Sequence, residues 1–226
     1  MKKFLVLIAV LVMTAVSSTA QNFIFNNPNN KAYWGIRVSP EIACPGKVSE
    51  SVGSLNVKLD AFNSGGGVEF GGIYNIPVVA NFYIEPGVKF FYDTYSVKKE
   101  FLSNPGLVLN SLSIKKFGMR IPVMAGYHFD FTNSIKVYLF TGPELEIGLS
   151  AKEYAKGQHN IEMSESIYGD EGDLNRVDLL WGLGAGVSYN HFYFSISGGL
   201  GMLNMLSDSY AKFHENRVTF SFGYNF

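Results

Sequence analysis

The feature that most constrains this chain is a two-residue alternation of side-chain character. Between Phe117 and Phe129 the odd positions are apolar, whereas the even positions include Gly118, Arg120, Gly126 and His128. Successive side chains of a β-strand point to opposite faces, so this pattern predicts a strand with one apolar face. The same alternation runs through 82–93, 135–149, 177–189 and 217–226, and in weaker form through 32–43, 66–75 and 191–203. We therefore expect eight strands.

The composition of the two faces favours a barrel in a membrane. No charge falls on the apolar face of the five clear strands, and a charge facing lipid at mid-depth costs about 2–4 kcal/mol. The opposite face is rich in glycine and serine, which suit the crowded interior of an eight-stranded barrel. A soluble exported β-domain, with its apolar face turned inward, remains an alternative.

The connections between the expected strands alternate in length. Those near 76–80, 129–134 and 189–191 are short, and the long ones are 44–65, 97–111, 151–174 and 204–215. Outer-membrane barrels have short periplasmic turns and long external loops. We expect an all-β fold over residues 32–226: an eight-stranded antiparallel transmembrane up-and-down β-barrel with four long external loops and short periplasmic turns.

The N-terminus has the three parts of a secretory signal peptide. Lys2 and Lys3 precede an apolar run over 4–16, and small residues follow up to Ala20. The run is shorter than the roughly 20 residues of a membrane-spanning helix. We expect residues 1–20 to be a signal peptide cleaved after Ala20. The asparagine-rich residues 21–31 read as a flexible N-terminal lead-in.

Charge and cysteine content exclude other classes. Lys plus Arg number 18 and Asp plus Glu 19, for a net charge of −1, which argues against a nucleic-acid partner. The single cysteine, Cys44, allows no intramolecular disulfide, and no role is assigned to it.

Three short segments and the chain end carry a family resemblance. The segments are Phe82-Tyr83-Ile84-Glu85-Pro86-Gly87, 120–127 (RIPVMAGY) and Thr141-Gly142-Pro143, and the chain ends on Phe226 after alternating aromatics. Over 32–226 the chain resembles the porin-family small outer-membrane β-barrel proteins (outer membrane protein beta-barrel domain family).

This resemblance implies the outer membrane of a Gram-negative cell. The family name implies a pore, although many members have no demonstrated channel, and the family includes small barrels attached to type IX secretion. Two alternatives follow: a narrow porin for ions or small solutes, and an accessory barrel of a type IX-like secretion machine. For the second, residues 21–31 are the only candidate tether for a periplasmic protein partner.

The alternation turns six basic and six acidic side chains toward the interior: Arg37, Glu41, Glu69, Glu85, Lys89, Lys116, Arg120, Lys136, Glu144, Glu146, Asp178 and Arg217. Charges in a space of low dielectric constant must be paired or neutralised. We predict a stabilising charge network in the lumen that plugs a monomeric barrel. Its members are Arg37, Glu85, Lys89, Arg120, Glu144 and Arg217. An ion-selective lumen is the alternative.

No catalytic, metal or cofactor site is predicted. His128 and His191 lie near short turns, and His159 and His214 lie in long loops without a patterned serine nearby. The acidic stretch 168–175 lacks the ligand spacing of an EF-hand loop, and no Cys/His cluster exists for zinc. We expect a structural or surface-interaction protein surrounded by outer-membrane lipid, with a surface ligand or a periplasmic protein as candidate partner. Loops such as 44–65 and 151–174 are where recognition usually resides.

Overall fold

A computed structural model describes residues 31–52, 55–104, 107–157, 162–168, 174–207 and 211–226. The expected signal peptide and residues 21–30 of the lead-in lie outside this described part. Within it, no helix is long and apolar enough to cross a membrane.

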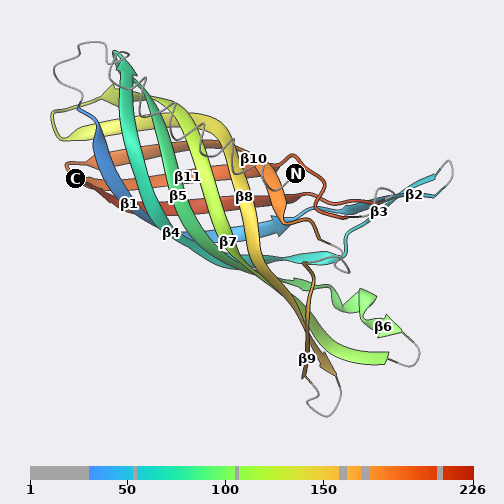
Figure 1. Cartoon of the computed structure of the whole chain (residues 1–226). Coiled ribbons are helices and arrows are strands. Elements are labelled where there is room, and N and C mark those ends of the chain that lie inside the picture. Colours follow the sequence, from blue (N-terminus) through green and yellow to red (C-terminus); the bar gives the residue numbers. More distant parts are fainter. Residues whose placement is uncertain (1–30, 53–54, 105–106, 158–161, 169–173, 208–210) are drawn as a thin grey trace, which may run out of the picture.

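Eight antiparallel strands form a closed ring (Figure 1). They are β1 (Tyr33–Pro45), β4 (Phe62–Val79), β5 (Phe82–Val97), β7 (Leu107–Asp130), β8 (Ile135–Gly157), β10 (Val177–Tyr189), β11 (Phe192–Gly201) and β13 (Glu215–Asn225). Each strand pairs with the one before it and the one after it in this series, and β1 closes the ring against β13. The predicted eight-stranded antiparallel barrel is confirmed.

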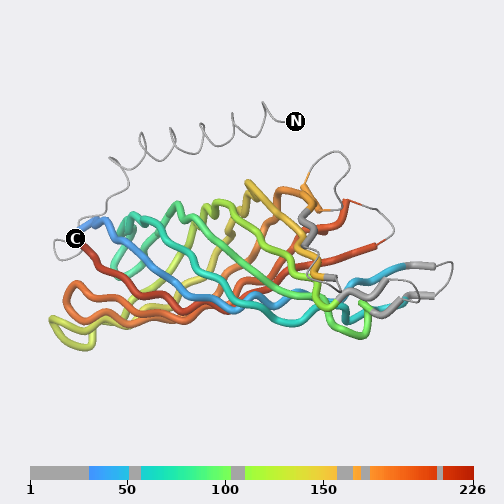
Figure 2. Tube along the Cα trace, turned by 90° about the horizontal axis from the view of Figure 1, so that it is seen from below, coloured from blue at the N-terminus to red at the C-terminus, as the bar shows by residue number. Residues whose placement is uncertain are grey.

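The two ends of the ring differ. Strands at one end are joined by short turns, and the C-terminus lies at this end (Figures 1 and 2). Two of these turns contain non-glycine residues with positive φ, Ala80 (49°) and Asn190 (52°). All the longer connections lie at the opposite end, which we call the long-loop end.

Much of the chain that the sequence predicts to be loop forms β-sheet in the structure. β2 (Val48–Val52), β3 (Leu55–Leu59) and β12 (Ala211–Lys212) form a three-stranded sheet, the first extension. The outer parts of β7 and β8, with β6 (Ser103–Asn104) and β9 (Glu162–Ser166), form the second extension; a short 3₁₀ helix, η1 (Lys99–Phe101), precedes β6. The backbone keeps its hydrogen bonds by continuing the ladder. The sequence gives no signal of this because alternation marks a strand only where its two faces meet different surroundings.

The ring is polar inside and apolar outside. Leu183 is 67% exposed and Trp34 63% exposed, whereas Arg120 and Lys116 are 2% and 0% exposed. Aromatic pairs gather around the short-turn end, among them Trp34–Tyr74, Phe82–Tyr127 and Tyr224–Phe226. An apolar exterior with aromatic girdles is the arrangement of a transmembrane barrel.

The lumen as candidate functional site

Arg120 is the centre of the interior. Its position on β7 points inward, and its guanidinium reaches carboxylates on four other strands. Nη1 donates to both oxygens of Glu41 at 2.7 and 2.8 Å, Nη2 to Asp93 at 2.6 Å and Nε to Glu146 at 2.9 Å. Glu69 lies 3.3 Å from Nη1. The Phe91 ring covers the guanidinium, with 3.9 Å between Cζ and the ring centroid. A single side chain therefore joins β1, β4, β5, β7 and β8 across the lumen.

Further ion pairs extend this cluster to β13. Arg217 on β13 pairs with Glu144 on β8, and Lys89 on β5 pairs with Glu69 on β4 at 2.6 Å. Lys116 on β7 contacts Glu146 at 3.1 Å and also pairs with Glu215 on β13. β7 and β13 lie opposite each other in the ring of eight. We call the set Glu41, Glu69, Lys89, Asp93, Lys116, Arg120, Glu144, Glu146, Glu215 and Arg217 the charged layer.

The structure brings together four of the six predicted network residues: Lys89, Arg120, Glu144 and Arg217. Glu85 instead accepts a hydrogen bond from Asn75 at 3.0 Å. The Arg37 guanidinium lies over the Tyr193 ring at 4.1 Å and donates from Nη1 to the Ile36 carbonyl, while its buried Nη2 has no hydrogen-bond partner in the described part of the chain.

Sequence reasoning missed two members of the charged layer. Asp93 is 4% exposed and lies on the polar side of the expected strand 82–93, so its alternation position could have identified it. Glu215 falls at the edge of a stretch expected as a loop, 204–215, and lacked such a signal. With both added to the predicted interior set, acidic side chains outnumber basic ones, so the equal balance inferred from the sequence is wrong.

A layer of tyrosines lies in the lumen nearer the short-turn end. Tyr83, Tyr138 and Tyr193 are buried against one another, with Phe140 alongside. Ring centroids lie 5.8 Å apart for Tyr83–Tyr138 and 5.5 Å apart for Tyr138–Tyr193. A cavity of about 50 Å³ borders this tyrosine layer and the charged layer, lined by Arg37, Glu85, Tyr193 and Arg217 among others. This volume has room for a few waters.

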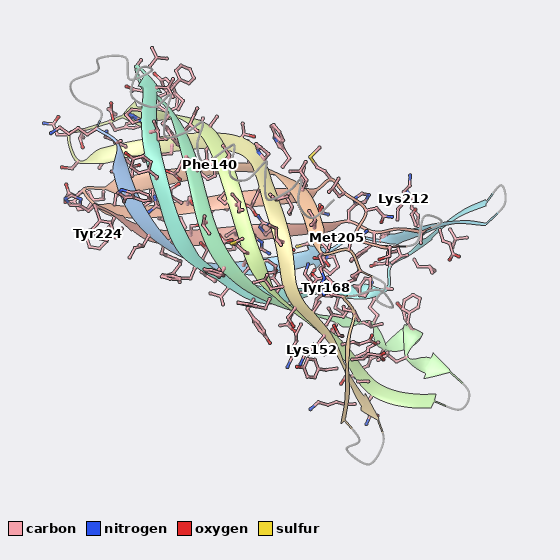
Figure 3. All side chains as sticks on the ribbon, viewed as in Figure 1. Phe140, Lys152, Tyr168, Met205, Lys212 and Tyr224 are labelled. Atoms are coloured by element: carbon pink, nitrogen blue, oxygen red, sulfur yellow. The ribbon has the colours of Figure 1, made fainter. Side chains whose placement is uncertain are left out.

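Packed loops cover the long-loop end. Ala151, Tyr168, Leu174, Met205 and Phe213 form a buried apolar cluster, which we call the loop core, and Val48 and Phe62 pack against it. Figure 3 labels Tyr168 and Met205 where the ring gives way to the extensions. Asn175 ties two loops together by donating to the carbonyls of Asn204 and Leu206, each at 3.0 Å. Burial raises the pKa of Tyr168 to about 12, so this hydroxyl stays neutral at ordinary pH.

The remaining candidate residues are dispersed. His128 lies 3.1 Å from Asp130, and His191 Nδ1 lies 2.8 Å from the Asn225 carbonyl, both at the short-turn end. His159 and residues 169–173 of the acidic stretch lie outside the described residues. Within the described ranges, no group of three or more His, Cys, Asp or Glu side chains is arranged to hold a metal ion. Cys44 is half-buried, with Sγ 3.7 Å from the Ile42 carbonyl.

A family model described as "Outer membrane protein beta-barrel domain" matches residues 19–207, most of the chain. The chain belongs to this family. This outer-membrane β-barrel protein therefore resides in the cell outer membrane.

Two solved structures are similar to this chain in fold. Ail, the attachment invasion locus protein of Yersinia pestis, is 16% identical over 87% of this chain and 100% of its own, with a TM-score of 0.39. Neisserial surface protein A is 13% identical over 87% and 100% of the two chains, with a TM-score of 0.42. A search of curated proteins finds no match.

Proposed function

We propose that this barrel is a closed, non-enzymatic monomer that acts at the cell surface through its long-loop end. Residues 1–20 are a signal peptide removed after Ala20, residues 21–31 are a lead-in on the periplasmic side, and residues 32–226 are the barrel. The short turns then face the periplasm and the two extensions face the outside, the usual orientation of such barrels.

The observation that carries this proposal is the filling of the lumen at successive heights. A solute entering from the short-turn end meets the tyrosine layer, then the charged layer, then the loop core. The charged layer joins opposite walls, because Lys116 and Glu215 come from strands on opposite sides of the ring. Eight strands leave an interior just wide enough for side chains to fill. Passage would require several buried ion pairs to separate at once.

The long-loop end supports the second half of the proposal. It carries two sheet extensions and a loop core with Met205 and Phe213 each only 1% exposed. Recognition commonly uses loops held by a rigid scaffold, and ordered loops lose less conformational entropy on binding. A surface ligand fits this arrangement better than a transported solute does.

Conductance of the refolded barrel in a planar bilayer tests the closed lumen. Folding is verified beforehand by the altered gel mobility of the unheated sample, and a wide porin reconstituted in the same way serves as the positive control. We expect no channel steps. Reproducible steps whose ion preference changes in Arg120→Gln or Glu144→Gln would establish the narrow porin instead.

Labelling of intact cells tests the orientation. In a Cys44→Ser background, Lys58→Cys on β3 should react with a membrane-impermeant maleimide. Thr132→Cys, in the short turn after β7, should react only after the outer membrane is opened. The reverse pattern would place the extensions in the periplasm and remove the surface role.

A further inference from the structure

Two lysines face each other on the outer surface, just beyond the apolar belt. Lys115 on β7 and Lys152 on β8 are direct partners in the strand register. Their neighbours Lys116 and Ala151 are buried inside, 0% and 1% exposed, so alternation turns Lys115 and Lys152 outward. Lys152 is exposed and Lys115 half-buried, and Figure 3 labels Lys152 at the root of the second extension.

Like charges directly opposite each other on a sheet are destabilising. The Lys115 ammonium lies over the Tyr154 ring, 4.3 Å from its centroid, a contact that attracts the cation but brings no negative charge to neutralise either lysine. Neither ammonium forms an ion pair with a carboxylate in the described part of the chain. Two outward-facing residues flank the pair on the neighbouring strands, Thr94 on β5 and Ser166 on β9. Both are uncharged, so neither neutralises a lysine.

The height of this pair in the wall indicates what supplies the missing negative charge. Phe117 lies two residues from Lys115 along β7 and is 43% exposed on the lipid-facing surface. On β8, Leu149 is 50% exposed. At about 3.3 Å per residue the lysines lie roughly 7 Å along the strands beyond this edge of the belt, and somewhat less in height because the strands of such barrels are tilted. Arg176 is exposed nearby, with Nη1 3.4 Å from the Leu149 carbonyl. On β11, two strands from β8 in the ring, and just after it, the large hydrophobic residues exposed at this edge are Leu200, Met202 and Leu203.

We propose that Lys115, Lys152 and Arg176, here called the rim patch, bind the phosphate groups of a phosphorylated glycolipid in the outer leaflet. The patch lies at headgroup depth and continues the surface already covered by acyl chains, so one lipid molecule can occupy both. Anionic headgroups attract each nearby lysine with an energy that corresponds to about a fivefold gain in binding. The inference rests on the proposed orientation, with the long-loop end outside.

Binding of diphosphoryl lipid A to the refolded full-length barrel tests the proposal. The protein is placed in phosphatidylcholine bilayers with increasing lipid A, and retained lipid A is counted by native mass spectrometry. We expect the Lys115→Gln/Lys152→Gln double variant to bind roughly thirtyfold more weakly than the unmodified chain. The matched control is Lys47→Gln/Lys58→Gln, which removes two exposed lysines, one just before β2 and one on β3, and should bind normally. Lys115→Arg/Lys152→Arg should also bind normally.

Three outcomes would overturn the proposal. One is equal lipid A retention by the double variant and the control. Another is equal weakening in both, which would indicate attraction by net charge alone. The last is competition by inorganic phosphate at concentrations like those of lipid A, which would indicate a site for free anions. All three are independent of the labelling result, because the bilayers present lipid A to both ends of the barrel.

Discussion

At the scale of single residues, Arg120 shows how a charged side chain can be buried inside a barrel. Its guanidinium satisfies carboxylates on four strands, and each of those carboxylates is oriented by it in return. Removing one partner of a buried ion pair leaves uncompensated charge and typically costs about 3–5 kcal/mol.

We therefore expect Arg120→Leu to lower the free energy of unfolding by about 3–5 kcal/mol. Urea unfolding of the refolded barrel, followed by fluorescence of the lipid-facing Trp34 and Trp181, measures this. The matched control is Arg176→Leu, an exposed arginine whose loss should change stability by no more than about 0.5 kcal/mol. Equal stability of Arg120→Leu and the unmodified chain would remove Arg120 from any stabilising role.

The acidic excess predicts that two carboxylates of the charged layer differ in importance. Glu146 accepts from both Lys116 and Arg120, whereas Asp93 forms an ion pair with Arg120 only and its buried Oδ1 has no hydrogen-bond partner among the described residues. Glu146→Gln should cost about 3 kcal/mol or more. Asp93→Asn keeps one acceptor for Arg120 and removes a surplus negative charge, so it should cost less than about 1 kcal/mol. The same unfolding assay distinguishes them, and a larger loss in Asp93→Asn would contradict the reasoning.

Alternation predicts which face a side chain occupies, and the interior positions of Arg120 and Arg217 follow from it. It does not predict partners. Arg217 pairs with Glu144, which lies three strands away around the ring, and Lys116 pairs with Glu215 on the opposite side. Such pairs depend on the diameter and stagger of the closed ring, which no local pattern encodes. Arg37 and Glu85 also point inward, but they lie nearer the short-turn end than the charged layer does.

At the scale of elements, the loop core joins the long loops to the outer ends of β4 and β8. Phe213 packs against Phe62 with ring centroids 5.1 Å apart, and the Met205 amide donates to the Phe213 carbonyl at 2.8 Å. Nothing in the alternation of the ring strands depends on this contact.

Phe213→Ala should loosen the loop core while the ring stays folded, because the lost apolar contacts lie in the loops and at the outer ends of ring strands such as β4, away from the rest of the ring. We expect faster cleavage of the long-loop end by an added protease, with the folded-barrel gel mobility retained. Phe101→Ala is the control, since Phe101 is 43% exposed on η1 and should leave the cleavage rate unchanged. Loss of the folded mobility in Phe213→Ala would show that the loop core supports the ring itself.

Strand lengths were the least predictable feature of the elements. The ends of β10, β11 and β13 follow the patterned segments closely, yet β7 and β8 continue well past Phe117 and Leu149. Their continuation carries Lys115, Lys152 and Tyr154 on one side and Ile114 on the other, and water meets both faces toward the tips. A strand without two contrasting environments has no reason to alternate.

At the scale of the whole molecule, the exposed apolar surface indicates where the bilayer lies. Leu183 is at the middle of β10, and Leu200 is near the long-loop end of β11, with similar exposures of 67% and 62%. In water the two positions would tolerate charge equally.

In a bilayer, Leu183 and Leu200 should not tolerate a charge equally. Leu183→Lys is expected to lower the free energy of unfolding by about 2–4 kcal/mol, and Leu200→Lys by at most about 1 kcal/mol, because the cost of a charge falls toward the interface. Urea unfolding in lipid vesicles measures both. Equal small effects would show that lipid does not cover this surface, as expected of the soluble alternative.

The meeting of β1 with β13 also governs the order in which the molecule can be built. Every other strand pair of the ring joins two strands that follow each other in the ring series. Each of these pairs can therefore form between segments that are near each other in the sequence. The seam that pairs Ile36 with Tyr224 and Val38 with Phe222 joins the two ends of the barrel sequence. Until β13 arrives, β1 and β11 each keep an edge of unpaired amides, which hydrocarbon does not tolerate. A chain interrupted before its last strand therefore has no stable form inserted in the bilayer.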